Sequence, residues 1–163
     1  MKKILLFAVV LCLAAFGAFA QTSKDGGKFS IGVNAGLPVG SASDYSNFAI
    51  GGDLKYSLPV ATNFDVSLSA GYTEFIGKGN LSANLKAIPV KLGGRYNFTG
   101  NNGFFGEAQF GAAFVQDGGG TTFVYAPGIG YAFNGGFEAG VRYEAWSKNG
   151  TVAQLGLRIA YSF

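Results

Sequence analysis

The chain has 163 residues, a formal charge of +3, one cysteine and no histidine, and 48% of its residues are hydrophobic while only 13% are charged. Charged residues make up about a quarter of a typical globular domain, so the composition excludes a disordered tail and offers no basic surface for nucleic acid. Without histidine, Ser-His-Asp and Cys-His catalysis and imidazole metal sites are excluded.

Residues 1–20 predict a cleaved secretory signal peptide. Lys2 and Lys3 precede an uncharged apolar run, residues 4–19, and the small residues at 18 and 20 fit a cleavage site. A membrane anchor, the alternative, needs about 20 apolar residues, and this run is too short. Cys12 lies within the run and would leave with it. We therefore predict a short periplasmic tail at 21–27 and one domain at 28–163.

From Phe29 onward, apolar and polar side chains alternate with a period of two, and clusters of Gly, Asn, Asp and Ser interrupt the alternation. This pattern predicts β-strands rather than helices. We expect eight strands of about 10 to 12 residues, close to the 9–11 with which a tilted strand spans a bilayer. The alternating runs are residues 29–37, 48–57, 64–72, 88–98, 104–114, 123–133, 137–146 and 153–163.

The two faces of these strands differ in bulk and in charge. The apolar face carries far more Phe, Tyr, Leu, Ile and Val than an eight-stranded interior accommodates, whereas the polar face is rich in glycine. The polar face therefore points inward, and the inverted orientation would cost about 10–20 kcal/mol for cations in lipid. Its acidic residues are Asp53, Asp65, Glu107, Glu138 and Glu144, and its basic residues are Lys55, Lys91, Arg95, Arg142 and Arg158.

Backbone groups in lipid must all pair within the protein, which requires a closed sheet. The sequence therefore predicts an all-β fold, an eight-stranded antiparallel up-and-down transmembrane β-barrel. A soluble lipocalin-like barrel and a two-sheet sandwich are the alternatives that alternation alone leaves open. Pro89 and Pro127 lie within predicted strands, so each is expected at a bulge or an unbonded position.

Aromatic residues gather at the strand ends and predict girdles at the two lipid–water interfaces. With the N-terminus periplasmic, the opposite girdle would contain Phe48, Tyr72, Phe114, Phe123, Tyr143 and Trp146. Periplasmic turns are expected at 59–63, 99–103 and 134–136, and longer outer loops at 38–47, 76–86, 115–122 and 147–151.

The segment Ile88-Pro89-Val90-Lys91-Leu92-Gly93-Gly94-Arg95-Tyr96-Asn97-Phe98, the eight amphipathic runs and the terminal Tyr161-Ser162-Phe163 resemble those of small outer-membrane barrels. The chain is similar to the OmpA/OmpX-like barrel domain common in Bacteroidetes. The resemblance implies the outer membrane of a Gram-negative bacterium, contact with outer-membrane lipid, and recognition of Tyr161 and Phe163 by the barrel-assembly machinery. Because no peptidoglycan-binding domain follows the eighth run, a cell-wall tether is not expected.

No catalytic motif is recognised in the sequence, and we expect a protein that is not an enzyme and has no metal or cofactor. Asp53 with Asp65, or Glu138 with Glu144, is the alternative acid/base pair. A charge-paired network among the ten inward residues is favoured, because cations accompany these carboxylates on the same face. We predict a largely closed lumen with a structural or interaction role. The alternative is a narrow pore for water, ions or small solutes, and no nucleic acid or extracellular partner is indicated.

Overall fold

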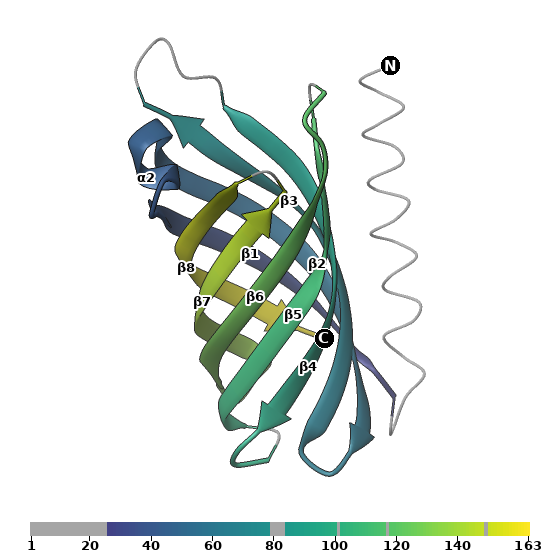
Figure 1. Ribbon diagram of the computed structural model, residues 1–163. Coiled ribbons are helices and arrows are strands. Elements are labelled where there is room, and N and C mark those ends of the chain that lie inside the picture. The colour runs from purple at the N-terminus through teal and green to yellow at the C-terminus, as the bar shows by residue number, and fades with distance from the viewer. Residues whose placement is uncertain (1–25, 79–83, 101, 117, 149) are drawn as a thin grey trace, which may run out of the picture.

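In the computed structural model, which describes residues 26–78, 84–100, 102–116, 118–148 and 150–163, the chain forms a closed barrel of eight antiparallel strands in sequence order. The predicted all-β up-and-down barrel is confirmed (Figure 1). The predicted signal peptide, with Cys12, and residues 21–25 of the predicted tail lie outside the described residues. The strands are β1 (Lys28–Val39), β2 (Ser46–Ala61), β3 (Phe64–Gly77), β4 (Leu85–Asn97), β5 (Gly103–Val115), β6 (Gly120–Ala132), β7 (Phe137–Ser147) and β8 (Thr151–Ser162).

The barrel has a loop end and a turn end. The loop end, at the top of Figure 1, carries the connections after β1, β3, β5 and β7, and the first contains a single helical turn, α2 (Ala42–Tyr45). The turn end carries the connections after β2, β4 and β6. In this fold class short turns face the periplasm and longer loops face outward. Among the described residues no helix is long and apolar enough to cross a membrane.

Several strand boundaries differ from the sequence prediction, because the strands have 11 to 16 residues. Pro59 to Ala61 were expected in a turn, but they continue β2 through a register shift. The turn is Thr62-Asn63, where Asn63 has a φ of 63°. Glycine and proline indicate where a strand can end, whereas pairing with a neighbouring strand can extend it past those residues.

The prolines at 89 and 127 lie beside gaps in strand pairing, as predicted. Pairs between β3 and β4 pass from Ala70–Val90 to Thr73–Ala87, skipping Pro89. Pairs between β6 and β7 pass from Tyr125–Ala145 to Gly128–Arg142, skipping Pro127. Each proline is paired on its other side, with Ala113 and Ala108 of β5 respectively. Because proline has no N–H to donate, it occupies an unbonded side of the ladder without interrupting the closed sheet.

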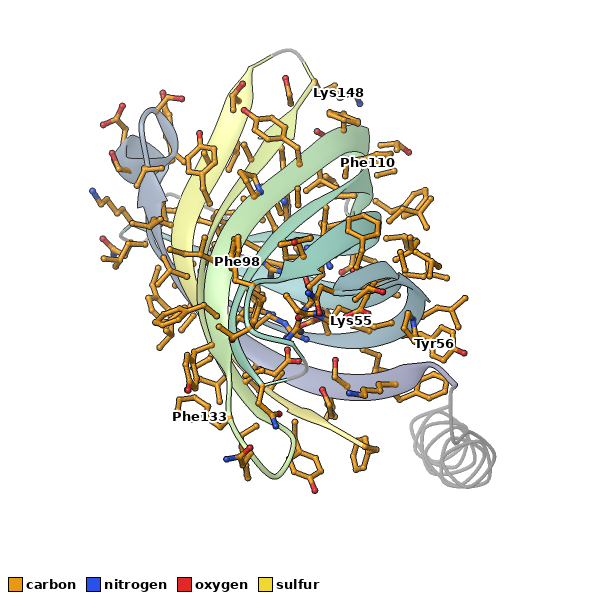
Figure 2. The ribbon with its side chains drawn as sticks, turned by 90° about the horizontal axis from the view of Figure 1, so that it is seen from below. Lys55, Tyr56, Phe98, Phe110, Phe133 and Lys148 are labelled. Carbon is orange, nitrogen blue, oxygen red and sulfur yellow. The ribbon has the colours of Figure 1, made fainter. Side chains whose placement is uncertain are left out.

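Side-chain direction follows the predicted alternation. Lys55 is 2% exposed and points into the barrel, whereas its neighbour Tyr56 is 37% exposed and lies on the outside (Figure 2). The other strands repeat this pattern, with large apolar side chains such as Leu68, Leu92 and Phe110 outside. The outer wall is therefore the apolar face, which is the arrangement that a lipid solvent requires.

An apolar cluster fills the interior near the loop end, on the face that the sequence analysis described as polar and rich in glycine. The rings of Phe75 and Trp146 meet edge to face with centroids 5.0 Å apart. Val124 and the buried alanines Ala49, Ala87 and Ala113 complete the cluster.

Trp146 was expected in the outer aromatic girdle, and that prediction is wrong. The side chain is 3% exposed, and its indole N–H donates a 3.1 Å hydrogen bond to Glu144. Trp146 lies two residues after Glu144, so a period of two places both on the inner face. The clustering of aromatics at strand ends does not distinguish the two faces, whereas the alternation does.

The position of Trp146 can be tested by fluorescence, because it is the only tryptophan in the chain. We expect lipids brominated on their acyl chains to quench Trp146 only weakly, since the indole is inside the barrel. The Tyr143→Trp/Trp146→Phe variant moves the fluorophore to an outward position on the same strand and should be quenched strongly. Equal quenching of the two proteins would contradict the interior assignment.

Candidate functional site

The barrel interior holds all ten charged residues that the sequence placed on the inner face. They come from β2, β3, β4, β5, β7 and β8, and period-two alternation on each strand turns them inward. None comes from β1 or β6, whose inward positions carry Asn34 and small side chains such as Ala126 and Gly128. The small inward residues of β1 and β6 therefore leave space for the long charged side chains from the other strands.

At the centre, one edge of the Arg158 guanidinium binds both carboxylate oxygens of Asp53. Arg158 Nε lies 3.1 and 3.2 Å from the two carboxylate oxygens, and Nη2 lies 3.0 Å from Oδ2. The pair crosses the inner face of β1 at Gly32, where a Cβ atom would lie 2.7 Å from Arg158 and 2.8 Å from Asp53. A side chain at position 32 would have to displace the ends of Arg158 and Asp53, because the ion pair occupies the space that Gly32 leaves open.

Glu138 joins this pair to the other central charges. Its Oε1 accepts a 2.6 Å hydrogen bond from Arg95, and its Oε2 lies 3.6 Å from Arg158 and 3.9 Å from Lys55. Lys55 in turn donates a 2.7 Å hydrogen bond to Glu107. The guanidinium of Arg95 also lies 3.7 Å above the ring centroid of Phe105, a cation–π contact.

A second cluster surrounds Glu144 beneath the apolar cluster. Glu144 is 2% exposed, accepts a short hydrogen bond from Lys91 and lies 3.6 Å from Arg142. Its other oxygen accepts hydrogen bonds from Trp146 at 3.1 Å and from Gln154 at 3.4 Å. The carboxylate is therefore satisfied on both oxygens, which a buried charge requires.

Two asparagines that the sequence analysis did not single out connect the parts of the network. Asn34 donates to Asp53 at 3.0 Å and accepts from Arg142 at 2.8 Å, which joins the Glu144 cluster to the centre. Asn97 accepts from Arg95 at 2.9 Å and donates to Asp65 at 3.0 Å. Both amides share the inward face with the charges, so alternation would have identified them.

Asp65 differs from the other nine predicted charges, because it makes no ion pair among the described residues and is reached only through Asn97. In each of the two carboxylate pairs considered for acid/base chemistry, at least one member is bound by a cation. Glu138 is bound by Arg95 and Glu144 by Lys91, while Asp53 is bound by Arg158. The geometry is that of ion pairing, with each strongly buried carboxylate held by its own cation.

Two cavities lie along the lumen. One of about 30 Å³ is bordered by Lys55, Glu107 and Arg158, a volume that accommodates about one or two water molecules. A larger one of about 170 Å³ lies at the turn end and is lined by Asp65 and Asn97, among others. No residue of the apolar cluster lines either cavity. Among the described residues, no group of three or more His, Cys, Asp or Glu is arranged to hold a metal ion.

The chain matches the model of the outer membrane protein beta-barrel domain over residues 8–163. It belongs to this family. The resemblance stated from the sequence is thereby confirmed, and the family implies residence in the outer membrane of a Gram-negative bacterium.

Solved structures of small outer-membrane barrels share the fold. Ail, the attachment invasion locus protein of Yersinia pestis, is 19% identical with a TM-score of 0.60, covering 85% of this chain and 99% of Ail. The outer membrane enzyme PagL is 19% identical with a TM-score of 0.68, covering 81% and 98%. The N-terminal barrel of Pseudomonas aeruginosa OprF is 19% identical with a TM-score of 0.53, covering 82% and 97%. No curated protein matches the chain.

The buried pair of Asp53 and Arg158 supports a stability prediction. Replacing Arg158 with Ala should lower the free energy of unfolding by about 3–5 kcal/mol, because it leaves a buried carboxylate without its cation. Arg95→Ala should act in the same direction through Glu138. The measurement is urea unfolding of the refolded protein in detergent micelles.

Lys86→Ala serves as the control, because Lys86 is 40% exposed and lies 3.9 Å from Glu74 at the loop end. An exposed pair of this kind contributes about 0–1 kcal/mol. If Arg158→Ala and Arg95→Ala unfold at the same urea concentration as Lys86→Ala, the luminal ion pairs do not stabilise the barrel.

Proposed function

We propose that this protein is a closed outer-membrane barrel with a structural or interaction role, whose loop end presents a braced rim. The single observation that carries the proposal is that the charge network and the apolar cluster fill the middle and the loop end of the lumen, while the cavity of about 170 Å³ lies at the turn end. An eight-stranded interior is just wide enough to be filled by side chains. The bilayer-spanning part then serves as an anchor rather than a passage.

The glycines of the inner face support closure. The sequence analysis kept a narrow pore as the alternative to a closed lumen, and empty space beside these glycines would favour that pore. At Gly36 a Cβ atom would meet the amide of Gln154 at 2.3 Å, and at Gly111 it would meet the backbone oxygen of Val90 at 2.0 Å. These positions are small because side chains and neighbouring backbone already occupy the space, and a water path there would have to displace them.

The rim at the loop end is braced by hydrogen bonds between its connections. Lys78, which directly follows β3, donates to the carbonyl of Ser43 in α2, and Ser41 donates to the carbonyl of Thr151 at 3.2 Å. Lys148 donates to the carbonyl of Gly119 at 3.0 Å. Such cross-links reduce the entropy lost on binding, which favours a recognition surface.

We also propose that the protein is not an enzyme. The chain contains no histidine, and its most buried carboxylates accept hydrogen bonds from Lys55, Lys91, Arg95 or Arg158. Oxygens that are engaged by cations in this way are not free to exchange a proton with a substrate.

Recognition of Tyr161 and Phe163 by the barrel-assembly machinery is part of the same proposal. The two rings pack with centroids 5.1 Å apart on the outer face of β8 and beyond its end, and Tyr161 also meets Phe137 at 5.0 Å. Both side chains are on the outer surface, where another protein can contact them while the barrel forms.

The closed lumen is tested by single-channel recording of refolded protein in a planar bilayer. We expect no discrete conductance steps from protein whose folding is verified by the different migration of unheated and boiled samples on a denaturing gel. Steps that change in size in Arg95→Gln or Glu107→Gln would overturn the closed barrel and favour a narrow pore. Steps that these variants leave unchanged would point away from the lumen, towards membrane damage around the protein.

A further inference from the structure

The buried part of the charge network contains one more cation than it has carboxylates. Each of its four carboxylates is bound by a cation of its own, in the pairs Asp53–Arg158, Glu107–Lys55, Glu138–Arg95 and Glu144–Lys91. Arg142 is the fifth cation, and among the described residues it forms an ion pair only with Glu144, at 3.6 Å, which Lys91 already holds. Its hydrogen bonds go to the neutral amides of Asn34 and Gln109, at 2.8 and 3.4 Å.

Asp65 does not supply the missing negative charge. It is half-buried and lines the cavity at the turn end, where water reaches it. Its link to the network is the amide of Asn97, which bonds to Arg95 rather than carrying a charge itself. A buried cation needs a counterion as well as hydrogen bonds, so the excess charge at Arg142 favours an anion close by.

The smaller luminal cavity lies beside this excess charge. Its volume is about 30 Å³, and it is bordered by the cations Lys55, Arg142 and Arg158 and by the carboxylates Glu107 and Glu138. The charges around the cavity therefore sum to a positive value.

Gln109 adds a hydrogen-bond donor at the same level of the barrel. The side chain is 3% exposed, and its amide oxygen accepts the bond from Arg142. Its amide nitrogen is buried and has no acceptor among the described residues. Ala126, the strand partner of Gln109, lines the cavity. A buried N–H without an acceptor costs free energy, so this donor also favours an acceptor beside Arg142.

We propose that the cavity binds one chloride ion as the counterion of Arg142. A monatomic anion fits a volume that holds about one or two water molecules, whereas sulfate and phosphate are too large. The ion accepts hydrogen bonds as water does, and it also adds the negative charge that the buried network lacks. Glu138 borders both this cavity and the larger one, so the ion enters from the turn end, the side from which Lys55 is seen inside the barrel (Figure 2).

The test measures chloride binding through urea unfolding of refolded protein in a nonionic detergent. Sodium chloride replaces sodium gluconate at constant ionic strength, and the unfolding midpoint should rise with chloride because the ion binds the folded barrel. We expect Arg142→Gln to bind chloride about tenfold more weakly, equivalent to ~1.4 kcal/mol. Glu107→Gln should bind it more tightly, because it removes a negative charge from the cavity wall. Lys148→Gln, which removes an exposed cation at the loop end, is the control and should match the wild type.

Crystals of the wild type grown in sodium bromide locate the ion independently of any variant. We expect an anomalous scattering peak in the cavity beside Arg142, since bromide substitutes for chloride. An equal effect of chloride on all four proteins would overturn the proposal, because salt would then act elsewhere on the barrel. A cavity without a bromide peak would overturn it as well, and would leave water as the occupant. Neither result depends on whether the lumen conducts, so this inference and the closed-barrel proposal can fail separately.

Discussion

The pairing of every backbone group within a closed sheet is the constraint on which the rest of this structure depends. Hydrocarbon offers no hydrogen bonds, so β1 must return to β8, and the closed wall then has an inside and an outside. A period of two along each strand assigns every side chain to one of them. Charge burial follows from this assignment, since a Lys or Arg on the outside of the wall would meet lipid at about 2–4 kcal/mol each.

Once the charges are inside, their mutual arrangement becomes the second constraint. Removing charges from water is compensated only when each finds a partner with good geometry. Arg158 achieves this by binding both carboxylate oxygens of Asp53. Asn34 links Asp53 to Arg142 through one hydrogen bond to each. The neutral amides matter as much as the ions here, because they turn separate pairs into one network that spans from the turn end to the apolar cluster.

The strand number, the direction of the faces and the inward position of all ten charges could be predicted from the sequence, because each depends only on alternation along one strand. The partners could not, because pairing across the lumen joins residues such as Asp53 and Arg158 that lie 105 positions apart. Trp146 was assigned to the outer girdle because it lies at a strand end, although the alternation that turns Glu144 inward also turns Trp146 inward. The turn after β2 was misplaced because Pro59 can stay in a strand through a register shift.

Glycines on both faces of the same wall make room for larger neighbouring side chains. Inside, Gly32 is small because Asp53 and Arg158 need its space, so the inner glycines are a consequence of dense filling and do not imply a channel. Outside, a Cβ atom at Gly94 would lie 2.9 Å from the ring of Phe64, and one at Gly106 would lie 3.5 Å from the ring of Phe98. The inner glycine therefore makes room for an ion pair, whereas these outer glycines make room for aromatic rings. The same small residue serves charge pairing on the side away from lipid and aromatic packing on the side that faces it.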